Sequence, residues 1–324
     1  MQSLPTVKAV RTNASADDVH PLVVGGAGFL GSHLVDRLLA EGVAVDVVDD
    51  LSTGALGNLA DARVAGGTLK IHTLDVRLGD FGSLVGMRRP DVIYHLGLLT
   101  PGQAGHDVDG TAVSSLLSAL EAARTSGVGK LIVALPAADL YGDVPSRDLP
   151  VKESRVLEPQ GLRGVLARTV IDLLNLYRNE HSVEYTALAM SSVYGPRQRP
   201  SDGVVAAFAD AAASAAPLVV HGDGRQTRDL LYADDAVDAL YRSAQRGGGL
   251  LVNVGTGIQT SIRELASLVD PNAEIVGALR RHGDITRVAL SPTRARIHLQ
   301  WSPWTNLASG VRNTVAASAR DKTG

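Results

Sequence analysis

The chain has 324 residues, of which 45% are hydrophobic and 20% are charged, as in a soluble globular protein large enough for two lobes. Its net charge of −3 and its scattered positive charges argue against a nucleic-acid or membrane-surface partner. Without cysteine it has no disulfides or thiolate chemistry, and its nine histidines show no metal-ligand pairing, so we expect no metal site.

Residues 1–19 form a polar opening stretch that carries Lys8 and Arg11 and has no apolar core. This composition fits neither a signal peptide nor a membrane span. We therefore predict that this stretch is a flexible tail. We also expect a cytoplasmic protein that binds no membrane.

Strands and helices alternate along the next part of the chain. Short apolar runs predict buried strands at Pro21–Val24, Val43–Val48, Leu69–Leu74, Val92–Leu96, Leu131–Leu135, Tyr185–Met190 and Leu250–Val254. Apolar residues at helical spacing predict helices at Phe29–Ala40, Thr111–Arg124, Leu162–Arg178 and Ala233–Arg246. This alternation predicts an α/β fold with a Rossmann-type, doubly wound parallel sheet covered on both faces.

A glycine-rich turn lies between the first strand and the first helix, in the run Val23-Val24-Gly25-Gly26-Ala27-Gly28-Phe29-Leu30-Gly31-Ser32-His33-Leu34. Gly25 or Gly26 permits the tight turn, and Gly28 lets a pyrophosphate approach the backbone. Gly31 lets the helix pack on the strand, and the helix N-terminus offers N–H groups to the phosphates. The turn predicts a dinucleotide site, with a glycine turn that holds no ligand as the alternative. The residues expected to contact the cofactor here are Gly25, Gly28, Phe29, Leu30 and Gly31.

Carboxylates follow the second strand at the spacing expected for a ribose-binding residue. Asp49 would accept hydrogen bonds from the adenosine ribose and repel a 2′-phosphate, which favours NAD. Ser52 and Thr53 can hydrogen-bond a phosphate, so NADPH and NADH both stay open as the cofactor. The alternative for Asp49 is a solvated charge at a strand end. The residues expected to contact the cofactor here are Asp49, Asp50, Leu51, Ser52 and Thr53.

Further motifs follow along the chain, at Val47–Gly54, Leu74–Arg77, Asp91–Leu96, Leu140–Asp143, Val193–Gln198, Gly222–Asp229 and Val252–Gly257. Together with the glycine turn, these stretches resemble the extended short-chain dehydrogenase/reductase family, which includes nucleotide-sugar epimerases and dehydratases. The resemblance implies that Asp75 and Val76 hold the adenine. It also implies that the strand end at Leu96, Gly97 and Leu98 lies along the cofactor.

The resemblance also divides the chain into lobes. It implies a NAD(P)-binding Rossmann domain over residues 20–189, to which residues 225–256 return. Residues 190–224 and 257–324 would form a smaller substrate-binding lobe. Prolines and glycines punctuate this later part, so we expect the smaller lobe to consist of loops and short elements.

The family's catalytic residues are missing. None of the seven tyrosines is followed by a lysine four residues later. The resemblance places the family's serine or threonine at Ala137, its tyrosine at Arg163 and its lysine at Ala167. A guanidinium cannot donate a proton as the tyrosine does, because it stays charged in proteins. Arg163 either stabilises a developing alkoxide or faces solvent.

Several residues are expected around a substrate. The predicted pocket consists of Leu99, Thr100, Ala137, Ala138, Arg163, Met190, Ser191 and Ser192. Arg228 and Arg287 match positions that grip a nucleotide-sugar diphosphate in the family, or are inherited scaffold. His106 either reaches the substrate or is an exposed loop residue. Asp139 either imitates the acidic residue of the dehydratases or orders its own loop.

Losing general acid–base help costs about 10²–10⁴ in rate, whereas orientation can supply an effective molarity of about 10⁵–10⁸ M. A ketone whose own hydroxyl supplies the proton can therefore still be reduced. We predict a NADPH- or NADH-dependent ketoreductase whose substrate is an aromatic ketone, namely an aromatic polyketide with a carbonyl that is reduced by direct hydride transfer. The proton would come from a substrate hydroxyl or from water, and the enzyme would be similar to the atypical ketoreductases of antibiotic tailoring. The alternatives are a non-catalytic NAD(P)-binding sensor or scaffold, and a nucleotide-sugar epimerase or dehydratase with relocated catalytic residues.

Overall fold

A parallel seven-stranded sheet forms the centre of the protein. The structure is a computed structural model that describes residues 19–99, 110–280 and 283–322. The strand order is β11-β6-β5-β4-β1-β2-β3. The strands are β1 (Pro21–Val24), β2 (Val45–Asp49), β3 (Leu69–Thr73), β4 (Val92–His95), β5 (Lys130–Pro136), β6 (Glu184–Met190) and β11 (Leu250–Val254). The predicted α/β class and Rossmann-type sheet are confirmed.

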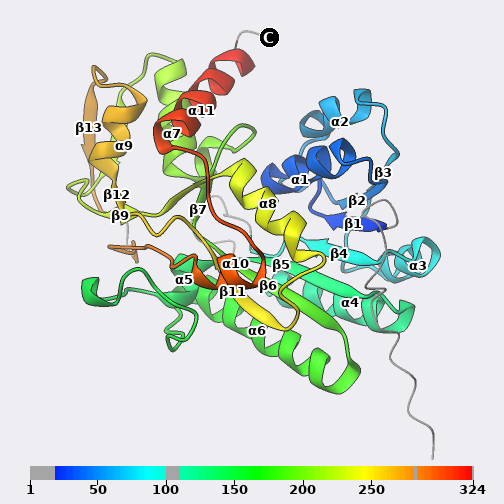
Figure 1. The fold of residues 1–324 in the computed structure, drawn as a ribbon. Helices are drawn as coiled ribbons and strands as arrows, with labels where there is room; N and C mark the ends of the chain where they lie inside the picture. Colours follow the sequence, from blue (N-terminus) through cyan, green and yellow to red (C-terminus); the bar gives the residue numbers. More distant parts are fainter. Residues whose placement is uncertain (1–18, 100–109, 281–282, 323–324) are drawn as a thin grey trace, which may run out of the picture.

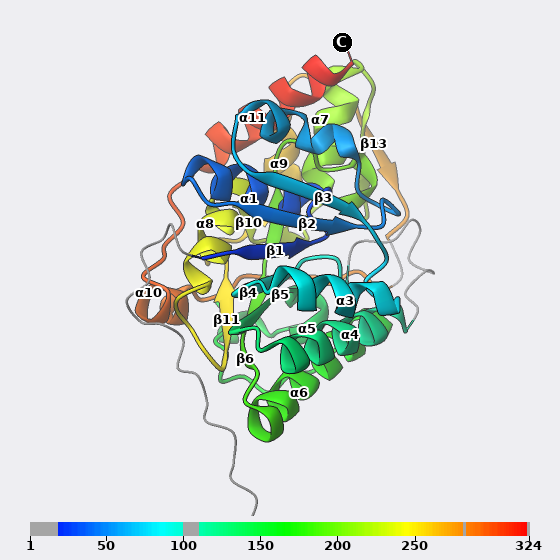
Figure 2. The ribbon, with the colours of Figure 1, turned by 90° about the vertical axis from the view of Figure 1, so that its right-hand side faces the viewer.

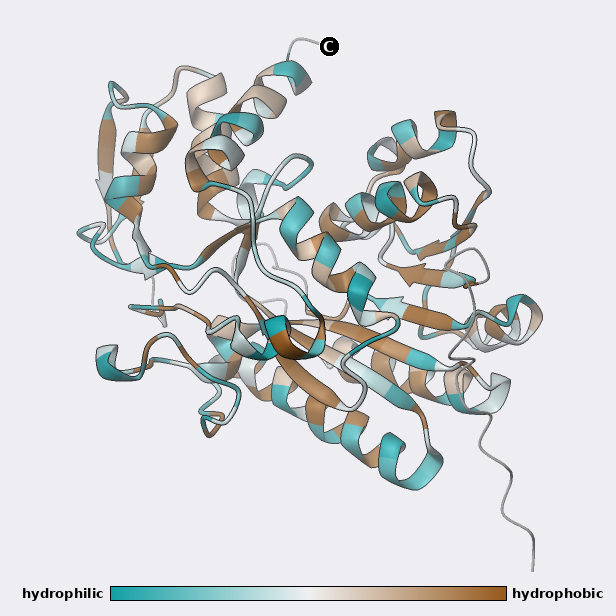
Figure 3. Cartoon of the chain, in the orientation of Figure 1, coloured by the Kyte–Doolittle hydropathy of each residue, from teal (hydrophilic) through white to brown (hydrophobic). Residues whose placement is uncertain are grey.

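Helices cover both faces of this sheet (Figures 1 and 2). One face carries α3 (Gly79–Arg88), α4 (Thr111–Ser126), α5 (Ala137–Tyr141) and α6 (Gly161–His181). The other carries α1 (Phe29–Ala40), α8 (Ala233–Ser243) and α10 (Thr293–His298), with η2 (Leu56–Leu59) and α2 (Ala60–Val64) beside α1. Side chains alternate along each strand, so Leu22 enters one hydrophobic core and Val23 the other. Figure 3 shows hydrophobic residues concentrated along the strands.

A smaller lobe has its own core, in which Phe208, Leu265 and Val311 are buried. Its helices are α7 (Val204–Ala213), α9 (Ile262–Val269) and α11 (Leu307–Asp321), and η5 (Pro200–Asp202) precedes α7. Around them lie three strand pairs: β7 (Ser192–Tyr194) with β10 (Leu230–Tyr232), β9 (Thr227–Arg228) with β12 (Thr260–Ser261), and β8 (Leu218–His221) with β13 (Ile275–Ala278).

The expectation of loops and short elements in this lobe was wrong for two helices. Helix α7 has 10 residues and α11 has 15. Helix α7 is almost entirely alanine and valine, so its sequence lacks the contrast between apolar and polar faces that marks a surface helix. Helix α11 is rich in small residues, which blur the same contrast.

The predicted division into domains stays a prediction. Of the predicted tail, only Val19 lies within the described residues. Strand β11 pairs with β6 in the main sheet, and α8 packs against the same core as α1. Within the described ranges, no helix has the length and apolar character needed to cross a bilayer.

Candidate functional site

A large cleft runs along the carboxyl ends of the central strands and continues to the smaller lobe. Its volume is about 1710 Å³, whereas a site for one small ligand typically occupies about 300–1,000 Å³. Its walls come from the glycine turn, the ends of β2 and β4, α4, α6 and the segment 197–208. Open α/β sheets bind their ligands at this edge. The cleft has room for a dinucleotide and a second ligand.

The glycine turn is shaped by its backbone. Gly25 has φ +77°, so it is the glycine that takes the left-handed conformation of the tight turn. A Cβ atom on Gly31 would lie 2.0 Å from the carbonyl oxygen of Gly25, so only glycine lets α1 pack this closely on β1. Gly28 is the N-cap residue of α1, and no side chain caps this end. The backbone therefore fits a pyrophosphate at the start of α1.

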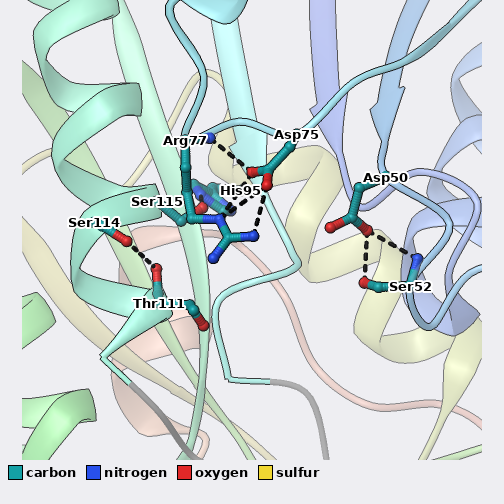
Figure 4. A network of polar contacts seen from close by, with 8 residues as sticks. All are labelled: Asp50, Ser52, Asp75, Arg77, His95, Thr111, Ser114 and Ser115. Carbon is teal, nitrogen blue, oxygen red and sulfur yellow. Dashed lines mark hydrogen bonds and ion pairs between the residues drawn. The ribbon is translucent and has the colours of Figure 1, made fainter.

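Asp49 and Asp50 differ in what they contact. The Asp49 carboxylate accepts hydrogen bonds from the backbone N–H groups of Ala27 at 2.8 Å and Leu51 at 2.9 Å. Burial raises the pKa of Asp49. Asp50 is exposed and accepts a 2.6 Å hydrogen bond from the Ser52 hydroxyl (Figure 4). Asp49 thus shapes the turn as well as lining the cleft, while Asp50 presents its charge to solvent.

Beside the predicted Asp75, the analysis of the sequence missed three polar residues of the cleft: Arg77, His95 and Ser115. Arg77 donates two hydrogen bonds from Nε and one from Nη2 to the Asp75 carboxylate, and these bonds lower the pKa of Asp75 (Figure 4). His95 Nε2 lies 2.7 Å from the Ser115 hydroxyl, and its Nδ1 is buried without a partner. Burial lowers the pKa of His95 to about 4, so the imidazole is neutral at pH 7. All of these side chains line the cleft.

The structure brings nearly all the predicted cofactor residues together. The residues that line the cleft are Gly25, Gly28, Phe29, Leu30, Gly31, Asp49, Asp50, Ser52, Thr53, Asp75, Val76, Leu96, Gly97 and Leu98. Leu51 does not line it. This residue has φ +61° and packs against the core on the α1 side.

The predicted substrate pocket is only partly assembled. The predicted residues that line the cleft are Leu99, Arg163, Met190, Ser191 and Ser192. Ala137 and Ala138 do not, because the first turn of α5 packs into the core, where Ala137 is fully buried. Thr100 and His106 lie outside the described residues.

Arg163 joins two walls of the cleft. Its Nη2 donates a 2.8 Å hydrogen bond to the carbonyl oxygen of Leu99, and its Nη1 lies 3.4 Å from Asp139 Oδ2. The side chain lines the cleft instead of facing bulk solvent. Burial raises the pKa of Asp139, and the charges of Arg163 and Arg228 oppose that rise. Asp139 is thus a partly buried carboxylate near two arginines of the cleft.

The two arginines predicted to grip a diphosphate lie in different surroundings. Arg228 lines the cleft, and its Nη2 lies 2.5 Å from Asp284 Oδ1. Arg287 is exposed and lies away from the cleft lining. Within the described ranges, no group of three or more histidine, aspartate or glutamate side chains is arranged to hold a metal ion.

The chain belongs to the NAD dependent epimerase/dehydratase family, whose model matches residues 21–255. It is 38% identical over 312 residues to a UDP-glucose 4-epimerase of Mycolicibacterium smegmatis, which covers 91% of this chain and 96% of the relative. It is also similar to a crystal structure of UDP-glucose 4-epimerase with UDP-glucose from Thermotoga maritima (TM-score 0.86, 29% identity, 94% of this chain and 100% of that one). A Thermus thermophilus UDP-glucose 4-epimerase in complex with NAD has a TM-score of 0.85 at 28% identity, over 93% and 99% of the two chains.

These relatives correct the predicted function. These three relatives in sequence and structure are UDP-glucose 4-epimerases, so the ketoreductase that reduces an aromatic polyketide was the wrong main prediction. That prediction was based on the absence of the family's tyrosine and lysine. The scaffold that the chain shares with the epimerases was a better guide to its function. The predicted membership of the extended family and the nicotinamide dependence are confirmed at the level of the family.

Proposed function

We propose that this protein is an NAD-dependent enzyme that oxidises and reduces again a hydroxyl-bearing carbon of a nucleotide sugar, as in 4-epimerisation. The observation that carries the proposal is the ion pair between Arg163, which lines the cleft, and Asp139, whose Oδ2 lies 3.4 Å from Arg163 Nη1. The same cleft holds a glycine turn built for a dinucleotide. The similarity to UDP-glucose 4-epimerases over nearly the full length supports the substrate class.

The glycine turn, Asp49 and Asp50 would hold the cofactor. Two carboxylates at this edge disfavour the 2′-phosphate of NADP by charge repulsion, so we assign NAD to the site. When bound, NAD supplies the acceptor and later the donor of a hydride. The remaining cleft, which extends past Arg163 to Arg228, would hold the nucleotide sugar.

Asp139 would replace the missing tyrosine as the proton acceptor. Oxidation of an alcohol requires a base for the hydroxyl proton as the hydride leaves the carbon. Burial raises the pKa of Asp139, which makes its carboxylate a stronger base than an exposed aspartate. The Arg163 guanidinium would stabilise the negative charge that develops on the substrate oxygen. In the return step, Asp139 would give the proton back to that oxygen.

The test is interconversion of UDP-glucose and UDP-galactose by the purified protein supplied with NAD. We expect turnover by the wild type, and a loss of about 10²–10⁴ in kcat for Asp139→Asn, because general-base help of that size is removed. NAD affinity should be unchanged in the variant. Absence of turnover of any nucleotide sugar by NAD-loaded wild-type protein would contradict the proposal, as would full activity of Asp139→Asn.

A matched control exists on the same helix as Arg163. Arg168 Nε and Asp172 Oδ2 on α6 are 3.9 Å apart, and both side chains are about half or more exposed. Asp172→Asn therefore removes an aspartate of an arginine pair without altering the cleft. We expect its kcat to equal that of the wild type.

A second candidate is an NAD-binding protein without turnover, such as a redox sensor. The absence of any tyrosine followed four residues later by lysine favours it. Ala167, at the position where the resemblance puts the lysine, is fully buried against the core. NAD binding without conversion of any nucleotide sugar would select this candidate.

A further inference from the structure

The segment 195–203, which connects β7 to α7, reaches back to helix α1. Arg197 Nη1 lies 2.6 Å from Asp36 Oδ2, and Arg197 Nη2 lies 3.4 Å from Asp61 Oδ2. His33 Nε2 lies 3.0 Å from the carbonyl oxygen of Pro196. The neighbouring residues Pro196 and Arg197 thus contact the side chains of His33 and Asp36, which lie one turn apart on α1.

These contacts hold the segment in a specific shape. Arg197 has φ +66°, a left-handed conformation that costs a non-glycine residue about 1 kcal/mol or more. Its side chain is 20% exposed, so the ion pair with Asp36 is partly shielded from water. A carbonyl oxygen only accepts hydrogen bonds, so His33 Nε2 carries the ring N–H and donates a hydrogen bond to the carbonyl oxygen of Pro196.

His33 contributes as a neutral group. Burial is the largest influence on its pKa, which lies below the ordinary value. The charged groups that face it are Arg197, which also lowers the pKa, and Asp234 and Asp36, which raise it. The hydrogen bond between His33 and Pro196 is therefore one between neutral groups. By contrast, the ion pairs of Arg197 with Asp36 and Asp61 are charged contacts between the segment and the main lobe.

The two sides of this contact line different parts of the same cleft. The first turn of α1, with Phe29, Leu30 and Gly31, lies at the glycine turn where a pyrophosphate fits. The segment from Arg197 to Gly203 lines the cleft on the side of the smaller lobe. The ion pair of Arg197 with Asp36 therefore links the helix that begins at the glycine turn to the wall on the side of the smaller lobe.

We propose that Arg197 is a positioning residue that couples cofactor binding at α1 to the placement of the segment 195–203. With the ion pair intact, an NAD-loaded α1 holds this wall in the conformation seen in the structure. Without the ion pair, cofactor binding and the smaller lobe become independent. This proposal rests on the proposed function in one respect only, which is that the second ligand is a nucleotide sugar.

Hydrogen exchange of the segment 195–203, measured with and without NAD alone, tests the coupling without a second ligand. Coupling between sites typically amounts to about 5–150-fold, so NAD should slow exchange of this segment by about fivefold or more in the wild type. In Arg197→Ala this effect should fall below about twofold while NAD still binds. Protection by direct contact with NAD would persist in Arg197→Ala and would overturn the proposal, as would absence of protection in the wild type.

Two further variants keep the test decisive. Asp36→Asn removes the charge from the α1 side with little change in shape, and we expect the same loss of protection as in Arg197→Ala. Arg124→Ala removes an arginine whose partner, Glu121, lies on the same exposed face of α4, and we expect wild-type protection. Retained protection in Asp36→Asn would overturn the proposal even if Arg197→Ala did not fold.

The affinity of UDP, measured with and without NAD, extends the test to the second ligand. We expect NAD to change UDP affinity about fivefold or more in the wild type and less than about twofold in Asp36→Asn. Equal coupling in the two proteins would contradict the role of Arg197. Failure of the wild type to bind UDP at all would count against the nucleotide-sugar proposal, while hydrogen exchange would still decide the coupling.

Discussion

The glycine turn at β1 and the wall at Arg163 on α6 line one cleft but depend on the sequence in different ways. The turn is fixed by backbone geometry, since a Cβ atom on Gly31 would lie 2.0 Å from a backbone oxygen. The wall is defined by side chains, of which Arg163 lines the cleft and pairs with Asp139. A backbone site tolerates almost no substitution, whereas a wall of side chains can change its chemistry within the same fold.

This difference explains how the chain can keep the cofactor-binding turn of its family while its proton-transfer group is a different one. Cofactor binding requires the strand, the turn and the helix together, and all three are present. The proton-transfer group has to supply only one suitable atom near the substrate. We propose that the Asp139–Arg163 pair supplies it here.

The largest expected effect comes from breaking the backbone side of the comparison. In Gly31→Val the new Cβ atom would meet the backbone of Gly25 at 2.0 Å and the Cα atom of Gly26 at 2.7 Å. Neither can give way as a flexible side chain would, so we expect a cost of about 3 kcal/mol or more and loss of NAD binding. Calorimetric titration with NAD measures it. Wild-type affinity in this variant would contradict the assignment of the turn.

A smaller effect is expected from acidification. The pKa of His95 is lowered to about 4 in the folded state, and the pKa of an unfolded histidine is about 6.5. Below pH 6.5 the His95 imidazole is protonated in the unfolded chain but stays neutral in the folded chain. The free energy of unfolding therefore falls as the pH drops from 6.5 toward 4. The loss should approach about 3 kcal/mol. Urea unfolding at several pH values should show this slope, and His95→Phe should flatten it. An unchanged slope in His95→Phe would place the titrating group elsewhere.

The side-chain wall should respond more mildly to Arg163→Ala. Removing this cation raises the pKa of Asp139 further, because Arg163 lowers it. The carboxylate acts as a base only above its pKa, so the acid side of the pH–rate profile should move to higher pH. At neutral pH we expect turnover to fall about tenfold, which is about 1.4 kcal/mol. Arg168→Ala on the same helix serves as the control. A profile that does not move would show that Arg163 and Asp139 do not act together.

The smallest effect sharpens the contrast between constrained and unconstrained glycines. Gly82 lies in α3, and a Cβ atom there would meet nothing within 4 Å. Gly82→Ala should therefore stabilise the protein by about 0.4–1 kcal/mol, because alanine restricts the unfolded chain. Thermal unfolding measures the gain. A destabilised variant would show that open space around a glycine is not enough to predict tolerance in this fold.

Local patterns were sufficient to predict much of the main lobe. Strand β1, helix α1 and strand β11 have the bounds expected from their apolar periodicity and from the glycines beside them. The glycine turn has a signature in consecutive residues, so its part of the cleft was also predictable. Helix α7 was missed because its alanines and valines show no polar face.

The contacts that matter most for chemistry join residues far apart in the chain. Arg163 contacts a carbonyl oxygen 64 residues away, and Arg197 contacts an aspartate 161 residues away. Only the packing of α5 against α6 places Asp139 beside Arg163. Side-chain partners that are set by tertiary packing leave no local pattern in the sequence. The partners of Arg163 and Arg197 were therefore not predictable from the sequence.

The most direct test of the central claim is a single-turnover experiment on the NAD-loaded protein mixed with excess UDP-glucose. We predict that the near-ultraviolet absorbance of reduced nicotinamide appears transiently in the wild type and is absent in Asp139→Asn, although the variant still holds NAD. Equal absorbance in both proteins would remove Asp139 from the chemistry. No absorbance in the wild type with any nucleotide sugar would contradict the account and would favour an NAD-binding protein without turnover.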